Sequence, residues 1–184
     1  MIRPWPLANS KVEISNRIFT LKTDTCRSPR TGKEHDFYIL EAGSWVNVIP
    51  LTSAGQVVLV RQFRHGTRQT TLEIPGGLVE DGQTPAEAAA RELLEETGYA
   101  SGNLLLLGRT RPNPAILNNW CYSYLAESVT QVAEGELDEA EDLEVVLADS
   151  ADIPGMIKKG DIDHALVLSA FYYYHLHMNK VRDV

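Results

Sequence analysis

Hydrophobic and polar positions alternate along most of the chain in the short runs typical of β-strands. Two such runs, residues 17–29 and 34–43, flank a turn centred on Gly32 and predict an N-terminal hairpin. Residues 45–52 and 56–64 are more apolar and rich in β-branched side chains. Because only Ser53-Ala54-Gly55 separates them, they predict a second hairpin that belongs to a buried central sheet. The first sixteen residues contain two prolines and are expected to form a loose start.

The second half of the chain predicts further strands and then helices. Ile153, Met156 and Ile157 share one face of a short helix that ends at Gly160. A last helix begins after Asp163, a candidate cap, and is expected to bury one face. That face contains Val167, Ala170, Phe171 and Tyr174. The further strands predicted are residues 71–75, 102–111, 121–129 and 143–148.

The segment from 72 to 99 carries the strongest local signals. Thr84 is a suitable helix cap, Pro85 suits the first helical position, and Glu87 completes a capping box with Thr84. Gly98 is a typical helix stop. The residues between them are good helix formers. The sequence therefore predicts a helix over residues 85–97.

Three glutamates, Glu92, Glu95 and Glu96, lie within one turn of this helix and share a face, with Arg91 beside them. Acidic runs on helices are often only a solvated face, and that interpretation stays open. Two features favour a metal site: two leucines in the same turn require burial, and a Gly76-Gly77 turn precedes the helix, where the backbone can approach a ligand closely. Carboxylate oxygens gathered in this way suit Mg²⁺, with Mn²⁺ as the alternative.

These residues resemble the Nudix hydrolase family, whose box reads G-x5-E-x7-R-E-U-x-E-E-x-G-U, with U a bulky apolar residue. The chain has Gly77, then Gln83, then residues 91–99 as RELLEETGY. Every fixed position agrees except Gln83, where the box has Glu. We expect Gln83 to keep a hydrogen bond and to lose the charge.

Position by position, the resemblance implies the metal ligands. Glu92 and Glu96 would be the principal ligands of a divalent ion, with Glu95 a further or water-mediated ligand. The backbone carbonyl of Gly76 would add another oxygen, and Arg91 would orient the glutamates.

The resemblance also implies substrate contacts outside the box. In the similar ADP-ribose pyrophosphatases an arginine at the place of Arg64 faces the diphosphate; pairing of Arg64 with a surface acid is the alternative. Phe37 is a candidate to stack on the base, with Trp45 behind it. Glu73 alternates with apolar Leu72 and Ile74, so its side chain is expected to point away from theirs, toward the metal face.

An acidic segment, residues 134–142, precedes the last predicted strand. Such a segment is often simply solvated. The resemblance offers a second interpretation, in which one of its carboxylates is the general base for the attacking water. Glu141 is the best match by position, and Glu139 is the second choice.

Composition restricts the partners. The net charge of −8 makes a nucleic-acid backbone an improbable ligand. Cys26 and Cys121 have no metal-ligand spacing and require no disulfide, which fits a reducing cytoplasm. No apolar run reaches the roughly 20 residues of a membrane span, and the first residues do not resemble a signal peptide. A cytoplasmic protein with no membrane partner is expected.

The whole pattern predicts an α/β fold, by resemblance a Nudix-type α/β/α sandwich with a mixed central sheet. Residues 1–44 would form a strand-rich N-terminal extension and residues 45–184 the hydrolase domain. In the ADP-ribose pyrophosphatase group a similar extension crosses to the other subunit, which implies a homodimer.

The expected activity is Mg²⁺-dependent hydrolysis of a nucleoside diphosphate sugar, ADP-ribose first, to AMP and ribose 5-phosphate. Two alternatives stay open. One is another substrate, such as a GDP-sugar, a UDP-sugar or a dinucleotide. The other is a nucleotide sensor without catalysis, which Gln83 alone favours.

Overall fold

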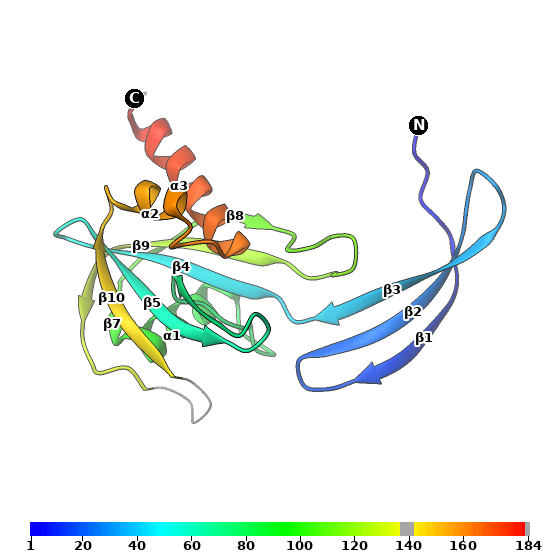
Figure 1. Ribbon diagram of the computed structural model, residues 1–184, viewed down its shortest axis with the longest axis horizontal. Helices are drawn as coiled ribbons and strands as arrows, with labels where there is room; N and C mark the ends of the chain where they lie inside the picture. The colour runs from blue at the N-terminus through cyan, green and yellow to red at the C-terminus, as the bar shows by residue number, and fades with distance from the viewer. Residues whose placement is uncertain (137–141, 183–184) are drawn as a thin grey trace. The chain divides into compact units, whose positions relative to one another are not determined.

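The structure is a computed structural model that describes residues 1–136 and 142–182, and the side chains of residues 1–136 and 142–179. The chain forms two compact units. The first comprises residues 1–43 and 111–120, and the second comprises residues 44–110 and 121–184. The elements (Figure 1) are β1 Leu7–Ser15, β2 Phe19–Arg27, β3 Glu34–Ala42, β4 Trp45–Thr52, β5 Gln56–Arg64, β6 Gln69–Glu73, α1 Pro85–Thr97, β7 Tyr99–Ala100, β8 Leu104–Thr110, β9 Cys121–Gln131, β10 Leu143–Asp149, α2 Ile153–Lys159 and α3 Ala165–Arg182.

The first unit is an antiparallel sheet in the order β1-β2-β3. The predicted hairpin is confirmed as β2 and β3, which pair from Phe19 opposite Ala42 to Arg27 opposite Glu34. The prediction of a loose start was wrong, because residues 7–15 form β1 and pair with β2 along its whole length. Backbone pairing with an existing strand outweighs the weak local propensity of this segment.

The second unit contains a mixed sheet in the order β10-β5-β4-β9-β7, with β6 beside β5 and β8 beside β9. The pair β4 and β9 is parallel, and the other pairs are antiparallel. The mixed central sheet predicted from the sequence is therefore confirmed.

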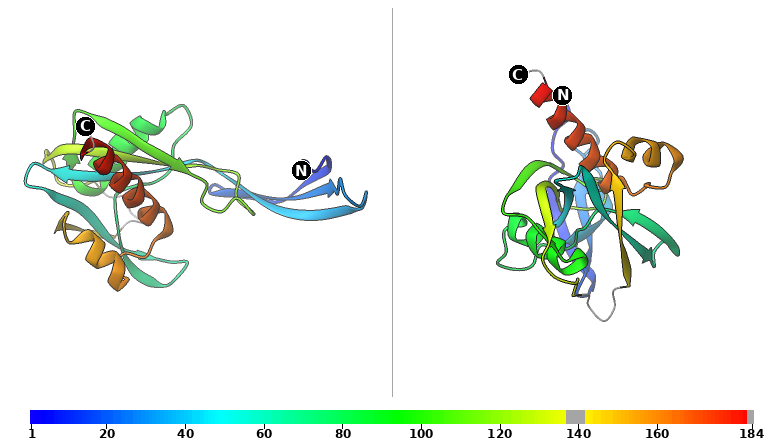
Figure 2. Two further views of the ribbon diagram at one scale, coloured as in Figure 1. Left: turned by 90° about the horizontal axis from the view of Figure 1, so that it is seen from above. Right: turned by 90° about the vertical axis from the view of Figure 1, so that its left-hand side faces the viewer.

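Helices cover both faces of this sheet, as Figure 2 shows, and the alternation of side chains along β4 and β5 explains how. On one face Val48 and Val58 pack with Ala88, Ala89 and Leu93 of α1. On the opposite face Ile49, Val57 and Leu59 of the sheet pack with residues of α2 and α3. The α3 residues are Val167, Ala170 and Phe171. The α/β/α sandwich is confirmed, and its first helix presents its glutamates at one edge of the sheet.

Helix α1 has the bounds that its signals predict. The Thr84 hydroxyl oxygen accepts from the backbone N–H of Glu87 at 3.3 Å, and the Glu87 carboxylate accepts from the N–H of Thr84 at 2.7 Å. Gly98 ends the helix with φ 71° and donates to the carbonyl of Leu94. The termini of α1 are therefore fixed locally, before packing is considered.

Within residues 1–136 and 142–182, none of the helices combines the length and the apolar character that crossing a membrane requires.

Candidate active site

The glycine turn that precedes α1 lies directly against two of its glutamates. The N–H of Gly76 donates to Glu96 Oε2 at 3.0 Å. A Cβ atom on Gly77 would stand only 2.2 Å from Glu92 Oε1. A side chain at Gly77 would therefore displace the Glu92 carboxylate, and a Cβ atom on Gly76 would stand 2.3 Å from the backbone oxygen of Val46. Glu92 and Glu96 are both buried, as metal ligands in a protein wall would be.

Packing of α1 places this pair at the edge of the core. Ala88, Ala89 and Leu93 face the sheet and are almost fully buried. Glu92 and Glu96, one turn apart, occupy the adjoining stripe. The small side chains bring the helix backbone close to the sheet, and the two carboxylates consequently meet the glycine turn.

Arg91 organises the outer side of the cluster. Its guanidinium donates to Glu95 Oε2 at 2.8 Å and to the carbonyl of Leu78 at 3.0 Å, and it lies 3.0 Å from Glu92 Oε1. Burial by itself lowers the pKa of Arg91, but the bond to Glu95 and the charge of Glu92 outweigh burial and raise the pKa. The cation is thus permanent.

The donor set fits a divalent cation. Two buried carboxylates next to a glycine turn supply hard oxygen atoms, which suit Mg²⁺ or Mn²⁺ when water and substrate complete the octahedron. Within the described part of the chain, no three histidine, cysteine, aspartate or glutamate side chains are gathered closely enough to hold an ion by themselves. Glu95, the third predicted ligand, is bonded to Arg91.

Gln83 keeps a hydrogen bond, within its own turn. Its side-chain oxygen accepts from the N–H of Glu80 at 3.4 Å, and its backbone N–H donates to the carbonyl of Glu80 at 3.1 Å. The amide therefore supports the loop that leads into the Thr84 cap.

A cavity of about 660 Å³ opens beside the glycine turn. Its walls combine the turn itself, the start of β4, the ends of β5 and β6, and the start of α3. Trp45 and Leu78 line one side, and Cys121 also borders the space. Burial raises the pKa of the Cys121 thiol to about 12, so this thiol stays protonated and is no nucleophile. The volume lies within the range of pockets that bind small molecules.

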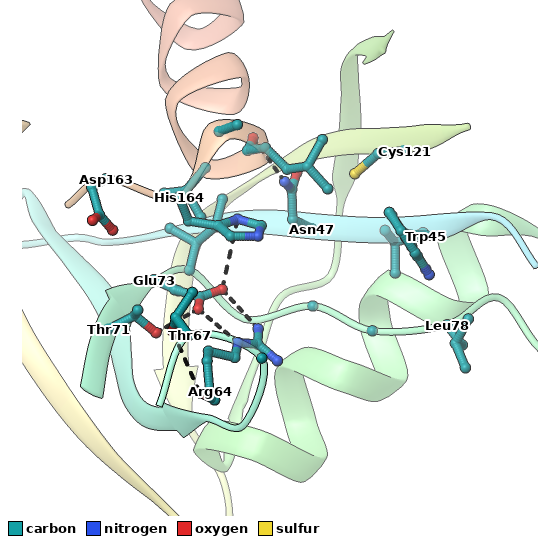
Figure 3. Close-up of a pocket in the computed structure, with 18 of the residues that line it drawn as sticks. Trp45, Asn47, Arg64, Thr67, Thr71, Glu73, Leu78, Cys121, Asp163 and His164 are labelled. Atoms are coloured by element: carbon teal, nitrogen blue, oxygen red, sulfur yellow. Dashed lines mark hydrogen bonds and ion pairs between the residues drawn. The ribbon is translucent and has the colours of Figure 1, made fainter. Parts of the chain in front are cut away.

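Glu73 and Arg64 form a two-point ion pair in this cavity (Figure 3). Arg64 Nε donates to Glu73 Oε1 at 2.8 Å, and Arg64 Nη2 donates to Glu73 Oε2 at 2.7 Å. The Thr71 hydroxyl donates to Glu73 Oε1 at 2.7 Å. Burial by itself raises the pKa of Glu73, but the bonds from Arg64 and Thr71 outweigh it, and the pKa is lowered. Arg64 thus pairs with an acid and also lines the pocket.

Among the pocket residues that were not predicted from the sequence are Asn47 on β4 and His164, which directly precedes α3. Each carried a usable signal. Asn47 is a polar residue within an apolar strand, and His164 directly follows the predicted helix cap Asp163. Their convergence depends on the packing of α3 over β4, which local sequence does not encode.

Of the remaining predicted residues, Trp45 lines the cavity and Phe37 lies in the first unit. Phe37 lies on β3 in the first unit, where its ring contacts Trp5 edge-on with 5.5 Å between ring centroids. Trp45 belongs to the second unit and lines the cavity. Glu139 and Glu141 lie outside the described residues.

Comparison with known proteins agrees with this geometry. Residues 43–171 match the model of the NUDIX domain. An ADP-ribose pyrophosphatase of Bacillus subtilis is 30% identical over 163 residues, 88% of each chain. The ADP compounds hydrolase NudE of Escherichia coli is 27% identical over 128 residues, 69% of this chain and 67% of the relative.

A crystal structure of an ADP compounds hydrolase superposes with a TM-score of 0.87 at 22% identity, covering 100% of this chain and 99% of the other. This likeness shows the fold. The domain match extends over more than half of the chain, and the glycine turn, Arg91 and the buried glutamates stand where the box predicts them. The chain belongs to the Nudix hydrolase family and is a pyrophosphohydrolase.

Proposed function

We propose that the protein hydrolyses ADP-ribose to AMP and ribose 5-phosphate. The observation that carries the proposal is the cavity that Gly76 and Gly77 line together with the cation of Arg64. A diphosphate needs both a metal ion and a cation, and the rest of the cavity can take an attached sugar. The names of the Bacillus and Escherichia relatives support an ADP-linked substrate.

The metal would be held by Glu92, Glu96 and the carbonyl oxygen of Gly76, with Glu95 as a further or water-mediated ligand. Mg²⁺ is the preferred ion and Mn²⁺ the alternative. When bound, such an ion neutralises charge on the diphosphate oxygens. Arg91 holds Glu92 and Glu95 in place through its ion pairs.

Arg64 would bind the diphosphate. Its Nε and Nη2 are fixed by Glu73, so the plane of the guanidinium is set before substrate arrives. A preorganised cation loses less conformational entropy on binding than a free arginine side chain does.

In the reaction a water molecule attacks one phosphorus, and the bond from that phosphorus to the bridging oxygen breaks. The bridging oxygen leaves with the other phosphate, and the attacking water loses its proton to a general base. We assign this role to Glu141, with Glu139 as the second choice, by their place before β10. Phe37 is proposed to stack on the base, with Trp45 as the alternative.

The substrate assignment is tested by measuring nucleoside monophosphate release from ADP-ribose, GDP-mannose, UDP-glucose, diadenosine diphosphate and nucleoside triphosphates. We expect the highest kcat/KM for ADP-ribose, and no turnover in the presence of a chelator. Adding Mg²⁺ back should restore more turnover than adding Ca²⁺, which would support a small octahedral ion. A higher kcat/KM for a GDP-sugar or a UDP-sugar would transfer the same chemistry to that substrate.

We also propose that residues 1–44 form an extension through which two chains make a homodimer. A small sheet depends on a hydrophobic face for its stability. In the first unit β1 is exposed along its whole length, and apolar Leu7, Val12, Ile14 and Tyr38 are exposed. A second copy of the chain would cover these side chains.

Dimerisation is expected to be visible by light scattering as about twice the mass of one chain at micromolar concentration. The double substitution Val12→Glu and Ile14→Lys should halve this mass, because charges would enter the covered surface. The matched change Lys11→Glu, at an already charged and exposed position, should leave the mass unchanged. A monomer for the unmodified chain would contradict the proposal.

A further inference from the structure

The pocket contains two buried polar atoms that lack a hydrogen-bond partner among the described residues, Asn47 Oδ1 and His164 Nδ1. Asn47 as a residue is 6% exposed. Leaving such a buried atom unpaired is unfavourable, so each unpaired atom needs an explanation. Figure 3 shows the Asn47 side chain beside the His164 ring, above Glu73. A ligand that enters the cavity can donate to Asn47 Oδ1, whereas His164 Nδ1 faces Glu73.

The amide orientation of Asn47 is fixed by its neighbour. Nδ2 donates to the carbonyl of Leu166 at 3.1 Å. A carbonyl can only accept, so the nitrogen must face Leu166 and the unpaired atom is the oxygen. Asn47 therefore offers an acceptor and requires a donor from the ligand.

His164 is oriented by Glu73. Its Nδ1 lies 3.8 Å from Glu73 Oε2, too long for a hydrogen bond but the closest recorded carboxylate contact of the ring. A movement of about 1 Å closes this gap, as apo sites often do when ligand binds. A proton on Nδ1 would then point to Glu73, which leaves Nε2 as an acceptor. The side chain is 39% exposed and lines the cavity, so Nε2 can reach a ligand.

This end of the cavity is rich in acceptors and in negative charge. Asn47 Oδ1 and His164 Nε2 both accept, and the carboxylates of Glu73 and Asp163 border the same space. A phosphate oxygen is an acceptor and cannot donate to Asn47 Oδ1 or His164 Nε2. The ring nitrogens of adenine are acceptors, and its 6-amino group is a single donor site. A sugar, by contrast, presents several hydroxyl donors close together.

We propose that Asn47 and His164 bind hydroxyl groups of the sugar-phosphate half of the substrate, with Glu73 positioning the His164 ring. The inference rests on the proposed cleavage of a nucleoside diphosphate sugar and assigns the sugar to the α3 end of the cavity. Glu73 then serves both halves of the pocket: it fixes Arg64 for the diphosphate and His164 for the sugar.

The test compares ADP-ribose with an analogue whose terminal ribose is replaced by a tetrahydrofuran ring without hydroxyl groups. His164→Ala should lower kcat/KM for ADP-ribose about tenfold or more, the effect of a lost hydrogen bond, and should leave kcat/KM for the analogue within about twofold. Asn47→Leu, which keeps the volume, should show the same selective loss. Product inhibition should agree: the inhibition constant of ribose 5-phosphate should rise in His164→Ala, and that of AMP should not.

The control is His175→Ala, an exposed histidine on the same helix that is bonded to Asn179 and does not line the cavity. This substitution should leave kcat/KM unchanged for both substrates. Equal losses on ADP-ribose and on the analogue would overturn the inference, because the role would then be structural. So would a weaker effect on IDP-ribose, which lacks the 6-amino group of adenine, since the base would then occupy this end. If the unmodified protein cleaves neither ADP-ribose nor the analogue, the proposed substrate itself is wrong. If the unmodified protein cleaves ADP-ribose and His164→Ala has the same kcat/KM, only the sugar contact is wrong.

Discussion

Glu96→Gln is expected to lower kcat about 10²- to 10³-fold or more while the protein stays folded. The carboxylate would lose its charge toward the metal ion, and charge stabilisation by such an ion contributes several kcal/mol to the barrier. The substituted amide keeps an oxygen that can accept from the N–H of Gly76. Turnover of ADP-ribose with saturating Mg²⁺ and the melting temperature without metal measure the two effects separately.

Stability should move in the opposite direction from activity. Glu92 and Glu96 are buried like charges one turn apart, so removal of one charge relieves repulsion when no metal is bound. The melting temperature of metal-free Glu96→Gln should therefore equal or exceed that of the unmodified protein. Glu87→Gln is the matched control, because it is the same change on the same helix and Gln also serves in a capping box. Normal turnover in Glu96→Gln would contradict the assignment of Glu96 as a metal ligand.

Arg64→Ala is expected to destabilise the protein by about 2 kcal/mol at pH 7, roughly 4–8 °C in Tm, and to raise KM. The destabilisation follows from the burial of Glu73, the partner of Arg64. The side chain of Glu73 is 3% exposed, so loss of Arg64 leaves a carboxylate buried without its cation. Arg64 itself is 43% exposed, which lets water reach the gap and keeps the cost at the low end for a buried pair. Thermal denaturation and steady-state kinetics measure the two effects.

The same pair predicts a pH dependence. The pKa of Glu73 is lowered from its ordinary value of 4.5, so the pair stabilises the fold above that pH. The stabilisation is lost as the pH falls through the lowered pKa of the folded protein. The difference in unfolding free energy between the unmodified protein and Arg64→Ala should therefore be largest near neutrality and should shrink as the pH drops below 4.5.

Arg61→Ala is the control for both effects. Arg61 lies on the same strand and is similarly exposed, at 45%, but its partner Glu144 is 65% exposed. A pair of this kind contributes about 0–1 kcal/mol. Equal melting temperatures for Arg61→Ala and Arg64→Ala would show that the burial of Glu73 does not decide the stability of the pair.

The sequence predicted α1 to the residue because the determinants of its ends are local. Thr84, Glu87 and Gly98 act within one turn of the positions they fix. The glycine turn and the glutamates lie within the same short segment, so their proximity could also be predicted from the sequence. Strand β1 was not, because its residues become a strand only by pairing with β2.

The substrate side of the site was only partly readable for a related reason. Arg64 and Glu73 were singled out separately, yet their pairing follows from the antiparallel register of β5 and β6, where Arg64 stands opposite Gln69 and Val60 opposite Glu73. Asn47 and His164 are far apart in the chain and meet only when α3 packs over β4. No local pattern encodes such an encounter.

The parallel pairing of β4 with β9 also determines when the site can form. β5 follows β4 after a three-residue turn, whereas β9 begins only at Cys121. Contacts between distant segments tend to form late, because the entropic cost of closing a long loop comes before the contacts stabilise the chain. Helix α1 packs on Val46 and Val48 of β4 together with Tyr124 and Ala126 of β9. We therefore expect the first half of the sheet to keep one edge unpaired until β9 is available, and α1 to complete its packing only then.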